Sequence, residues 1–331
     1  MILYPLKFQP ILKERLWGGT KLGTILGKSI SNNSTGESWE LSGVQGDVSV
    51  VANGELAGTS LNQLIETYTD DLLGKDVVRR FGKEFPILIK FIDAKQDLSI
   101  QLHPNDELAK KRHKSFGKTE MWYVMDADED ANLIVGFNQD VTKDVYAQSL
   151  ENDTLLELMN YEKVTKGDTF FINTGKIHAI GAGVLLAEIQ QTSDVTYRVF
   201  DFNRKDKDGN YRELHTELAL DAIDYKQKDD FRVQYSKEID QVNKMVDCPY
   251  FRTDYLNLQE DFTQDISNRD SFTIYMCVDG KAVISNESGA VPIVKGETTL
   301  LPANTNTVTI ETKGVTPVSY THLRAHETTS L

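Results

Sequence analysis

Short apolar runs separated by turn residues recur along most of the chain, and this pattern constrains its fold more than any other feature. From residue 86 onward such runs occupy 86–93, 98–103, 121–125, 132–137, 169–173 and 183–189. Short strands at regular spacing favour a β-sandwich or barrel over parallel βαβ units. We therefore predict a mainly β fold.

Helical spacing of apolar residues interrupts these strands. It appears in 61–73, 141–159 and 214–223, and Asn105 or Asp106 is a plausible N-cap for a further helix. We expect these helices to be insertions in a β domain.

A length of 331 residues suggests two domains. We place a first domain at 1–240, ending in a charged stretch, and a second β domain at 241–316. In the second domain, the runs 272–278 and 282–285 flank Asp279-Gly280, which predicts a β-hairpin. The second domain contains no histidine before residue 317, so we expect any metal chemistry in the first.

Residues 317–331 fit neither strand nor helix periodicity well. Residues 317–328 read as the in-frame translation of a transposase-based sequencing adaptor. We therefore interpret 317–331 as a non-native sequencing-adaptor scar. Its two histidines, His322 and His326, are excluded from the functional argument.

The charge balance excludes one class of partner. Lys and Arg number 36 against 50 Asp and Glu, a net charge of −14, and such a field repels nucleic acid. The N-terminus lacks a signal-peptide pattern, and no apolar stretch approaches the length of a membrane span. We expect a cytoplasmic monomer or weak homodimer that binds neither nucleic acid nor membrane.

A metal site is suggested by polar residues at strand edges. Period-2 alternation in 98–103 places Ser99, Gln101 and His103 on one face, and an inward polar row is costly unless something coordinates it. Glu120 precedes another strand, and His178 follows a turn. Two imidazoles, a carboxylate and an amide oxygen suit a divalent metal, with zinc favoured and manganese, iron and cobalt open.

Two lysines lie close to these strands. Lys118 would share the face of Glu120 if that strand extends back to it. Lys90 is enclosed by apolar residues and needs a counter-charge. A substrate phosphate and a structural salt bridge are equally open for Lys90.

Two arginines lie among aromatic and apolar neighbours in 194–204. Arg198 and Arg204 could each pair with a carboxylate, for which Asp194 and Asp201 are candidates. Either could instead bind an anion.

Six segments resemble type I mannose-6-phosphate isomerases, specifically the short bacterial form. They are Leu-Trp-Gly-Gly at 16–19, Gly-Glu-Ser-Trp-Glu-Leu-Ser at 36–42, and the segments 98–106, 117–123, 175–179 and 197–204. The resemblance extends to about residue 316. It implies a zinc-bearing cupin-type jelly roll with helical insertions and a second, smaller β-barrel.

The resemblance also implies site residues and one Zn²⁺ per chain. The implied zinc ligands are Gln101, His103, Glu120 and His178. The implied catalytic residues are Arg198, Lys118 and Asp194, the last a suspected ring-opening partner. The implied phosphate contacts are Lys90, Ser99 and Arg204.

The implied reaction interconverts D-mannose 6-phosphate and D-fructose 6-phosphate through an enediolate. The residues leave the base open among a lysine of lowered pKa, a metal-bound hydroxide and a carboxylate. Two alternatives remain. One is another metal-dependent cupin enzyme, such as a non-haem iron oxygenase, because two histidines and a carboxylate also suit iron. The other is a non-catalytic cupin that binds a sugar phosphate.

Overall fold

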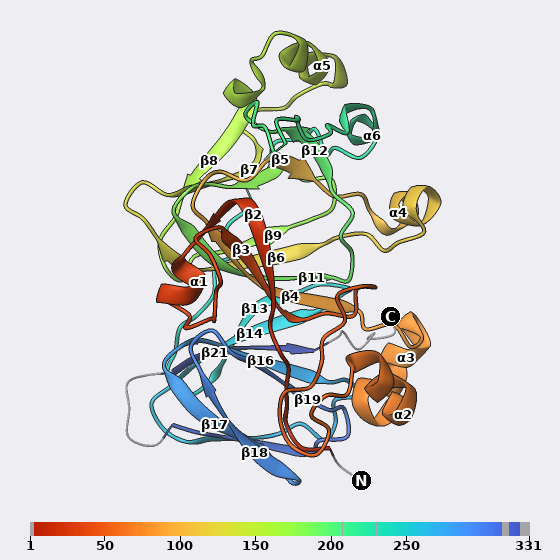
Figure 1. Ribbon diagram of the computed structural model, residues 1–331, viewed down its shortest axis with the longest axis vertical. Coiled ribbons are helices and arrows are strands. Elements are labelled where there is room, and N and C mark those ends of the chain that lie inside the picture. The colour runs from red at the N-terminus through yellow and green to blue at the C-terminus, as the bar shows by residue number, and fades with distance from the viewer. Residues whose placement is uncertain (1–2, 207, 230, 313–317, 325–331) are drawn as a thin grey trace.

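Two β-sandwiches are stacked along the long axis of the molecule (Figure 1). The computed structural model describes residues 3–206, 208–229, 231–312 and 318–324, the last stretch by its backbone alone. The prediction of a mainly β fold with helical insertions is confirmed.

The first sandwich contains the strands predicted from residue 86 onward. Its two sheets have the orders β2-β3-β4-β11-β6-β9 and β12-β5-β10-β7-β8. The strands of the first sheet are β2 (Ile11–Gly19), β3 (Thr35–Leu41), β4 (Ile87–Ala94), β6 (Glu120–Ala127), β9 (Thr169–Ile172) and β11 (Val184–Gln191). Those of the second are β5 (Ile100–Leu102), β7 (Asn132–Phe137), β8 (Met159–Lys163), β10 (His178–Ile180) and β12 (Tyr197–Phe200).

The helices are short and lie outside the sheets. They are α1 (Lys21–Thr24), α2 (Leu61–Leu73), α3 (Lys75–Phe81), α4 (Asp106–His113), α5 (Lys143–Glu151), a 3₁₀ turn (Leu155–Leu158) and α6 (Thr216–Leu220). The helix expected at 61–73 is confirmed, and Ser60 begins it with a reciprocal capping box. The expected helix at 141–159 divides into α5 and the 3₁₀ turn, and the one at 214–223 shortens to α6.

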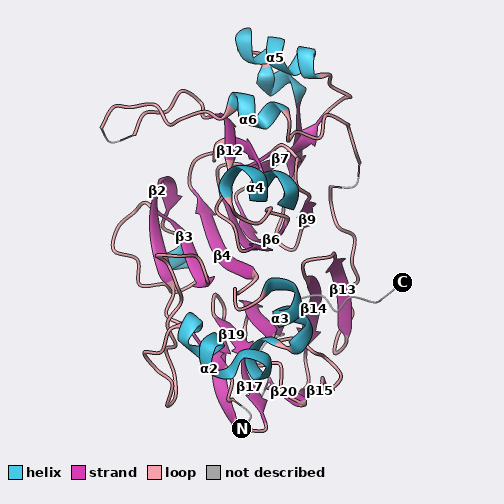
Figure 2. Ribbon diagram, turned by 90° about the vertical axis from the view of Figure 1, so that its right-hand side faces the viewer, coloured by secondary structure: helices cyan, strands magenta, loops and turns pink. Residues whose placement is uncertain are grey.

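Helices α2 and α3 join the two sandwiches. They follow β3 of the first sandwich in sequence but lie beside the second one (Figure 2). The backbone N–H of Phe272 bonds to the carbonyl of Leu73, and the Asp270 carboxylate accepts the N–H groups of Lys75 and Asp76 at the start of α3. A helix N-terminus favours such a negative charge.

The second sandwich has sheets of order β1-β19-β16-β21-β14-β13 and β15-β20-β17-β18. Its strands are β1 (Leu6–Lys7), β13 (Val242–Asp247), β14 (Arg252–Leu258), β15 (Phe262–Asp265), β16 (Thr273–Asp279), β17 (Lys281–Asn286), β18 (Gly289–Val294), β19 (Thr298–Leu301), β20 (Thr307–Glu311) and β21 (Val318–Arg324). β1 pairs with β19, so the start of the chain contributes a strand to the second sandwich.

The hairpin predicted around Asp279-Gly280 is wrong. β16 pairs with β19 and β21, whereas β17 pairs with β18 and β20 in the other sheet. β16 is buried along almost its whole length, and β17 alternates between buried and partly exposed residues. The Asp-Gly turn therefore carries the chain from a covered inner strand across to the facing sheet.

Part of the predicted adaptor segment 317–331 lies outside the described residues. Residue 317 and residues 325–331 are not described, and 318–324 form β21. The interpretation of this segment as non-native stays a prediction. No helix in the described ranges is long and apolar enough to span a membrane.

Candidate active site

A buried polar row crosses the large sheet of the first sandwich. The register places Trp39 of β3 opposite Lys90 of β4, Lys90 opposite Glu188 of β11, and Glu188 opposite Trp122 of β6. Side chains directly opposite each other in antiparallel strands lie on one face. These four side chains are at most 9% exposed, so the sheet carries charged groups into the interior.

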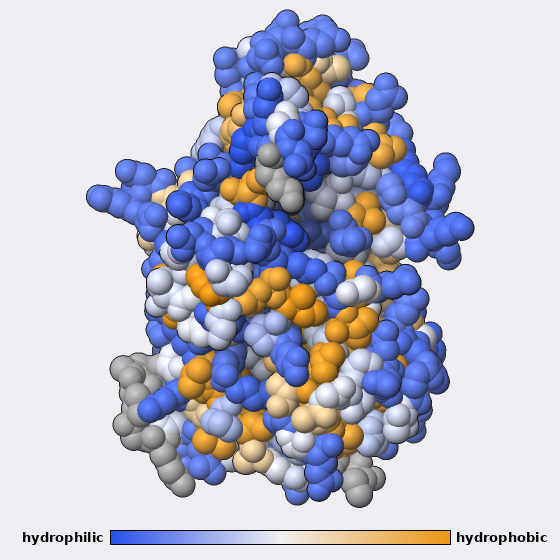
Figure 3. All heavy atoms as spheres, viewed as in Figure 1, coloured by the Kyte–Doolittle hydropathy of each residue, from blue (hydrophilic) through white to orange (hydrophobic). Residues whose placement is uncertain are grey.

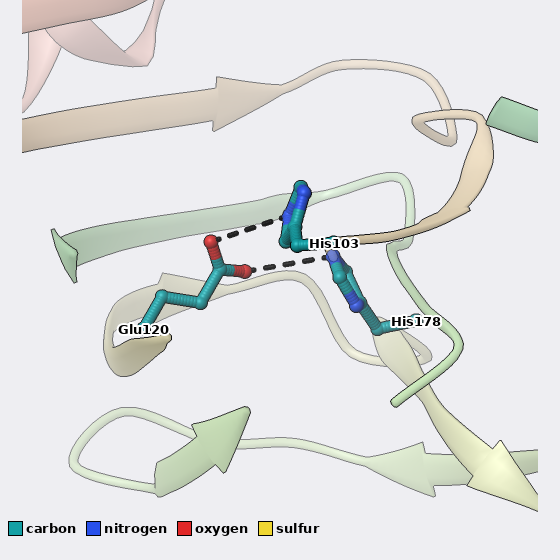
Figure 4. A group of neighbouring side chains, drawn as sticks. All are labelled: His103, Glu120 and His178. Carbon is teal, nitrogen blue, oxygen red and sulfur yellow. Dashed lines mark ion pairs between the residues drawn. The ribbon is translucent and has the colours of Figure 1, made fainter. Parts of the chain in front are cut away.

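Two histidines and a glutamate converge between the two sheets (Figure 4). Nε2 of His103 lies 3.5 Å from Oε2 of Glu120, and Nε2 of His178 lies 3.5 Å from Oε1. One ligand atom from each residue lies within 4.8 Å of the others, and all three residues are fully buried. Among the described residues, they form the one cluster of His, Cys, Asp or Glu able to hold a metal ion.

The far side of each imidazole ring is anchored to the backbone. Nδ1 of His103 lies 2.9 Å from the carbonyl of Val195, and Nδ1 of His178 lies 2.8 Å from that of Lys176. A carbonyl accepts, so each Nδ1 carries the proton and each Nε2 presents a lone pair to Glu120. This backbone support for a ring is the usual arrangement around metal-binding histidines.

The converging atoms make no hydrogen bond to the described protein residues, although Nζ of Lys118 lies 3.2 Å from Oε2 of Glu120 as an ion pair. Nε2 of His103, Nε2 of His178 and both carboxylate oxygens of Glu120 are buried without a hydrogen bond among the described residues. Leaving four buried polar atoms without hydrogen bonds at one place in a core costs free energy of folding. Two lone pairs facing a carboxylate suit a divalent cation, so these residues fit the metal that the sequence implies.

Gln101 belongs to the same face. It lies opposite His178 on one side and Arg198 on the other, in the strand order β12-β5-β10. Its Oε1 is 3.5 Å from the hydroxyl of Ser99. The alternation predicted for 98–103 thus brings Ser99 and Gln101 together with the histidine cluster.

Burial controls the charge of the two histidines. Desolvation lowers the pKa of His178 to about 4, and desolvation together with the Lys118 charge holds the pKa of His103 well below its ordinary value. Both rings are therefore neutral at physiological pH, the form in which imidazole binds a metal.

The two buried carboxylates respond differently. Desolvation and the negative charge of Glu188 raise the pKa of Glu120 to about 7. Burial disfavours the charge of Glu188 as well, but Lys90, Lys118 and the indole of Trp122 outweigh it and hold its pKa at about 2. Glu188 is thus the permanently charged member of the pair.

Lys118 lies beside Glu120, one of the candidate metal ligands. Its Nζ is 3.2 Å from Oε2 of Glu120, and the side chain is only 6% exposed. Burial acts against its charge, but Glu120 and Glu188 outweigh burial and raise the pKa of Lys118 above its ordinary value. Lys118 is therefore a buried cation beside the candidate metal ligands.

Lys90 already has protein partners. Its ammonium donates to Oε1 of Glu188 at 2.9 Å and to Oε1 of Gln190 at 2.7 Å, and it lies over the Trp39 ring. Sequence reasoning missed Glu188 and Gln190. Their alternation within an apolar strand was the available signal, the same one that identified Gln101 and His103.

Arg198 lies at the edge of the small sheet, beside Ser99. Its Nε donates to the Ser99 hydroxyl at 3.3 Å, and its Nη1 donates to the carbonyl of Glu213. His215 makes two hydrogen bonds to the backbone of Arg198. Its ring Nδ1 accepts the backbone N–H of Arg198 at 3.1 Å, and the backbone N–H of His215 donates to the carbonyl of Arg198 at 2.7 Å. His215 was not among the site residues predicted from the sequence.

Two predicted site residues lie apart from His103, Glu120 and His178. Arg204 pairs with the buried carboxylate of Asp201, one of the two partners considered for it. Asp194 is exposed and lines a cleft of about 1440 Å³ whose walls include His113 and Tyr250 but none of the candidate metal ligands.

Comparison with known proteins matches this architecture to one family. The family model for the catalytic domain of type I phosphomannose isomerase matches residues 5–137, which include Gln101, His103 and Glu120. The model for the cupin domain of mannose-6-phosphate isomerase matches residues 241–321.

Curated relatives and a solved structure agree. The mannose-6-phosphate isomerase ManA of Bacillus subtilis is 36% identical over 305 residues, covering 91% of this chain and 94% of that protein. A mannose-6-phosphate isomerase of Streptococcus mutans is 38% identical over 219 residues, 66% of this chain and 67% of that protein. The crystal structure of the B. subtilis mannose 6-phosphate isomerase has a TM-score of 0.86 at 30% identity, covering 98% of this chain and 100% of that chain. The predicted cupin-type fold is thereby confirmed, and the chain belongs to the type I phosphomannose isomerase family.

Proposed function

We propose that this protein interconverts D-mannose 6-phosphate and D-fructose 6-phosphate with one Zn²⁺ bound per chain. The observation that carries the proposal is the convergence of four buried ligand atoms without hydrogen bonds, from His103, Glu120 and His178, beside the buried cation Lys118. Family membership supports the choice of an aldose–ketose isomerisation among the reactions that such a site could perform.

The metal would be held by Gln101, His103, Glu120 and His178. A divalent cation supplies Lewis-acid charge that stabilises an oxyanion on the substrate, and it needs no redox chemistry to do so. Oxygen and nitrogen donors with one carboxylate suit zinc and leave room for a substrate. The backbone bonds at each Nδ1 fix the orientation of the two rings.

Lys118 would stabilise the charge that develops on the sugar. In the isomerisation a proton leaves C2, an enediolate forms, and a proton returns at C1. The enediolate oxygens carry negative charge, and a fixed ammonium in a water-poor site lowers the energy of that charge. The carboxylates of Glu120 and Glu188 keep Lys118 protonated, which suits this electrostatic role better than that of a free base.

The phosphate would bind at the Arg198 side of the site. Ser99 is predicted as a phosphate contact and lies within hydrogen-bond distance of Arg198. Lys90 and Arg204, the other predicted contacts, each pair with a buried carboxylate, which either would have to exchange for the phosphate. The geometry therefore favours Ser99 with Arg198, and Arg198, predicted from the sequence as a catalytic residue, is proposed here as a phosphate contact.

The other expectations from the sequence, on Asp194, cellular location, oligomeric state and partners, remain proposals. Asp194 remains a predicted ring-opening partner, from its position on the loop that also supports His103 through Val195. A cytoplasmic location, a monomer or weak homodimer, and the absence of nucleic-acid and membrane partners stay predictions.

A coupled assay tests this function. Purified protein with zinc should produce fructose 6-phosphate from mannose 6-phosphate, lose this activity with a chelator and regain it on addition of zinc. Absence of isomerase activity in folded, zinc-replete protein would overturn the proposal. Bound iron with oxygen consumption would favour the oxygenase alternative, and sugar-phosphate binding without turnover would favour the non-catalytic one.

A further inference from the structure

Two arginines share one buried carboxylate at the base of the loop that joins β12 to α6, and a third arginine lies close to them. The two ends of this loop carry Arg204 and Arg212, and Arg198 precedes it on β12. Asp201 accepts from both Arg204 and Arg212, and its side chain is only 6% exposed. The loop itself projects from the upper part of the molecule (Figure 2).

Cations exceed anions in this cluster. The charges that act on Arg198 include the guanidinium groups of Arg212 and Arg204 and the carboxylates of Asp201 and the exposed Glu213. Burial acts against the charge of Asp201, but hydrogen bonds from Arg212 and Arg204 outweigh it and lower its pKa. Burial lowers the pKa of Arg198, and the positive charge of Arg212 lowers it further, so these two guanidinium groups are electrostatic neighbours. Such a cluster is stabilised by an anion.

The arginines differ in the donors they have left. Arg204 uses all three nitrogens: Nε donates to the Asp201 carbonyl, Nη2 to the Asp201 carboxylate at 2.5 Å, and Nη1 to the carbonyl of Asp97. Arg212 donates side-on to the same carboxylate through Nε, at 2.6 Å, and through Nη2. Within the described part of the chain, Nη1 of Arg212 and Nη2 of Arg198 have no hydrogen-bond partner.

The cluster begins one strand away from the candidate metal ligands. Arg198 lies opposite Gln101 in the sheet and bonds to Ser99, whose hydroxyl is 3.5 Å from Oε1 of Gln101. A phosphorylated sugar whose carbonyl end meets the metal would extend its phosphate toward this edge. Guanidinium groups bind phosphate through paired, charge-assisted hydrogen bonds.

We propose that Arg212, rather than Arg204, is the second guanidinium of the phosphate site, acting with Arg198 and Ser99 to select phosphorylated sugars. Asp201 orients Arg212 side-on and leaves Nη1 to donate to the phosphate. Arg204 is a positioning residue that fastens the loop to Asp201 and Asp97. This inference rests on the proposed function, because it assigns the phosphate end of that substrate.

The test compares Arg212→Gln with Arg204→Gln as a matched control. Inorganic phosphate binding is measured by titration calorimetry, and kcat and KM are measured with mannose 6-phosphate. Arg212→Gln should weaken phosphate binding about tenfold or more and raise KM by a similar factor, while kcat changes by only a few-fold. Arg204→Gln should bind phosphate within about threefold of the wild type, and its loop should be cleaved faster in limited proteolysis.

Wild-type phosphate affinity in Arg212→Gln would overturn the inference, as would an equal loss in Arg204→Gln. If Arg212→Gln fails to fold, Arg212→Lys replaces it; this variant keeps the charge but not the side-on pair, so unchanged phosphate affinity in it would also contradict the inference. Phosphate binding is measured without turnover. An inactive wild type that binds phosphate through Arg212 would therefore overturn the proposed function alone, and an active enzyme indifferent to Arg212→Gln would overturn this inference alone.

Discussion

The two sandwiches of this molecule share an architecture and an apolar core, but among the described residues the first alone adds a buried cluster of candidate metal ligands. Between the sheets of the first lie His103, His178 and Glu120, with Lys118 beside them. Between the sheets of the second lies an apolar cluster that includes Leu256, Leu258, Tyr275, Cys277, Ile284, Ile293, Leu301, Val308 and Ile310. On the face shown in Figure 3, hydrophilic residues dominate the upper half and apolar patches gather in the lower half.

This contrast separates what the fold requires from what the site requires. The second sandwich shows that the architecture is stable with aliphatic side chains between its sheets. Burying imidazoles, carboxylates and ammonium groups in the first therefore opposes folding unless each finds a partner. The buried polar groups of the first sandwich are therefore explained by the chemistry of the site and not by the needs of the fold.

Removing a metal ligand should abolish activity while leaving the protein folded. His103→Ala should lose bound zinc and reduce kcat/KM by roughly a thousandfold or more, because a metal contributes several kcal/mol of transition-state stabilisation. Gln101→Ala should weaken zinc binding less, because a neutral amide is the poorer ligand. Metal content at limiting zinc and the coupled assay measure both.

A core variant of the second sandwich is the control for that comparison. Ile284→Ala should cost about 2–5 kcal/mol in the free energy of unfolding but leave the zinc content of the folded protein unchanged. Equal zinc occupancy in His103→Ala and Gln101→Ala would contradict the prediction that Gln101 is the weaker ligand. Loss of zinc in folded Ile284→Ala would contradict the prediction that zinc binding depends on the first sandwich alone.

Removing the buried cation should impair the reaction with the metal retained. Lys118→Met should lower kcat by roughly a hundredfold to a thousandfold, the usual effect of losing one donor that stabilises a developing oxyanion. KM should change little, because the lost interaction belongs to the transition state. A variant with wild-type kcat and full zinc occupancy would exclude Lys118 from the electrostatic role.

The buried ion pair of Lys90 and Glu188 can be replaced by apolar side chains like those between the sheets of the second sandwich. Removing one partner, as in Lys90→Met, should destabilise the fold by about 3–5 kcal/mol, because Glu188 is left buried and charged. The double variant Lys90→Met with Glu188→Leu should recover most of that loss while remaining impaired in activity. Denaturant unfolding measures the stabilities, and no recovery in the double variant would show that the pair stabilises the first sandwich.

His215 should contribute to the acid sensitivity of the first sandwich, together with the buried rings of His103 and His178. Burial and the Arg198 charge hold the pKa of His215 below its ordinary value of 6.5. The unfolded chain binds this proton more readily, so the stability from neutral His215 is fully present above about pH 6.5 and is lost as the pH falls through the lower folded-state pKa. His215→Asn, which can accept the Arg198 N–H without titrating, should lose less unfolding free energy than the wild type as the pH falls below about 6.5, measured by denaturant unfolding at each pH. An equal loss in both proteins would contradict this.

Alternation of polar residues within apolar strands was the sequence signal that best predicted which side chains share a face. Alternation in 98–103 placed Ser99 and Gln101 correctly on the face that meets His178. The same signal at Glu188 and Gln190 was missed, because an apolar strand with two polar residues also reads as an ordinary buried strand. Arg212 lies in a polar loop, and only folding brings it to Asp201.

Strand pairing was harder to predict than strand position. The strands before and after Asp279-Gly280 were located within about one residue of β16 and β17, yet they enter different sheets. A turn signal records local backbone preference, whereas the burial of β16 on both faces decides its neighbours.

The central claim is that the polar interior of the first sandwich exists to hold a metal. The most direct test is elemental analysis of the purified protein together with anomalous diffraction at the zinc edge. The account predicts one zinc per chain, with a single anomalous peak among Nε2 of His103, Nε2 of His178 and the carboxylate of Glu120. Zinc-replete, folded crystals with no peak at these atoms would contradict it.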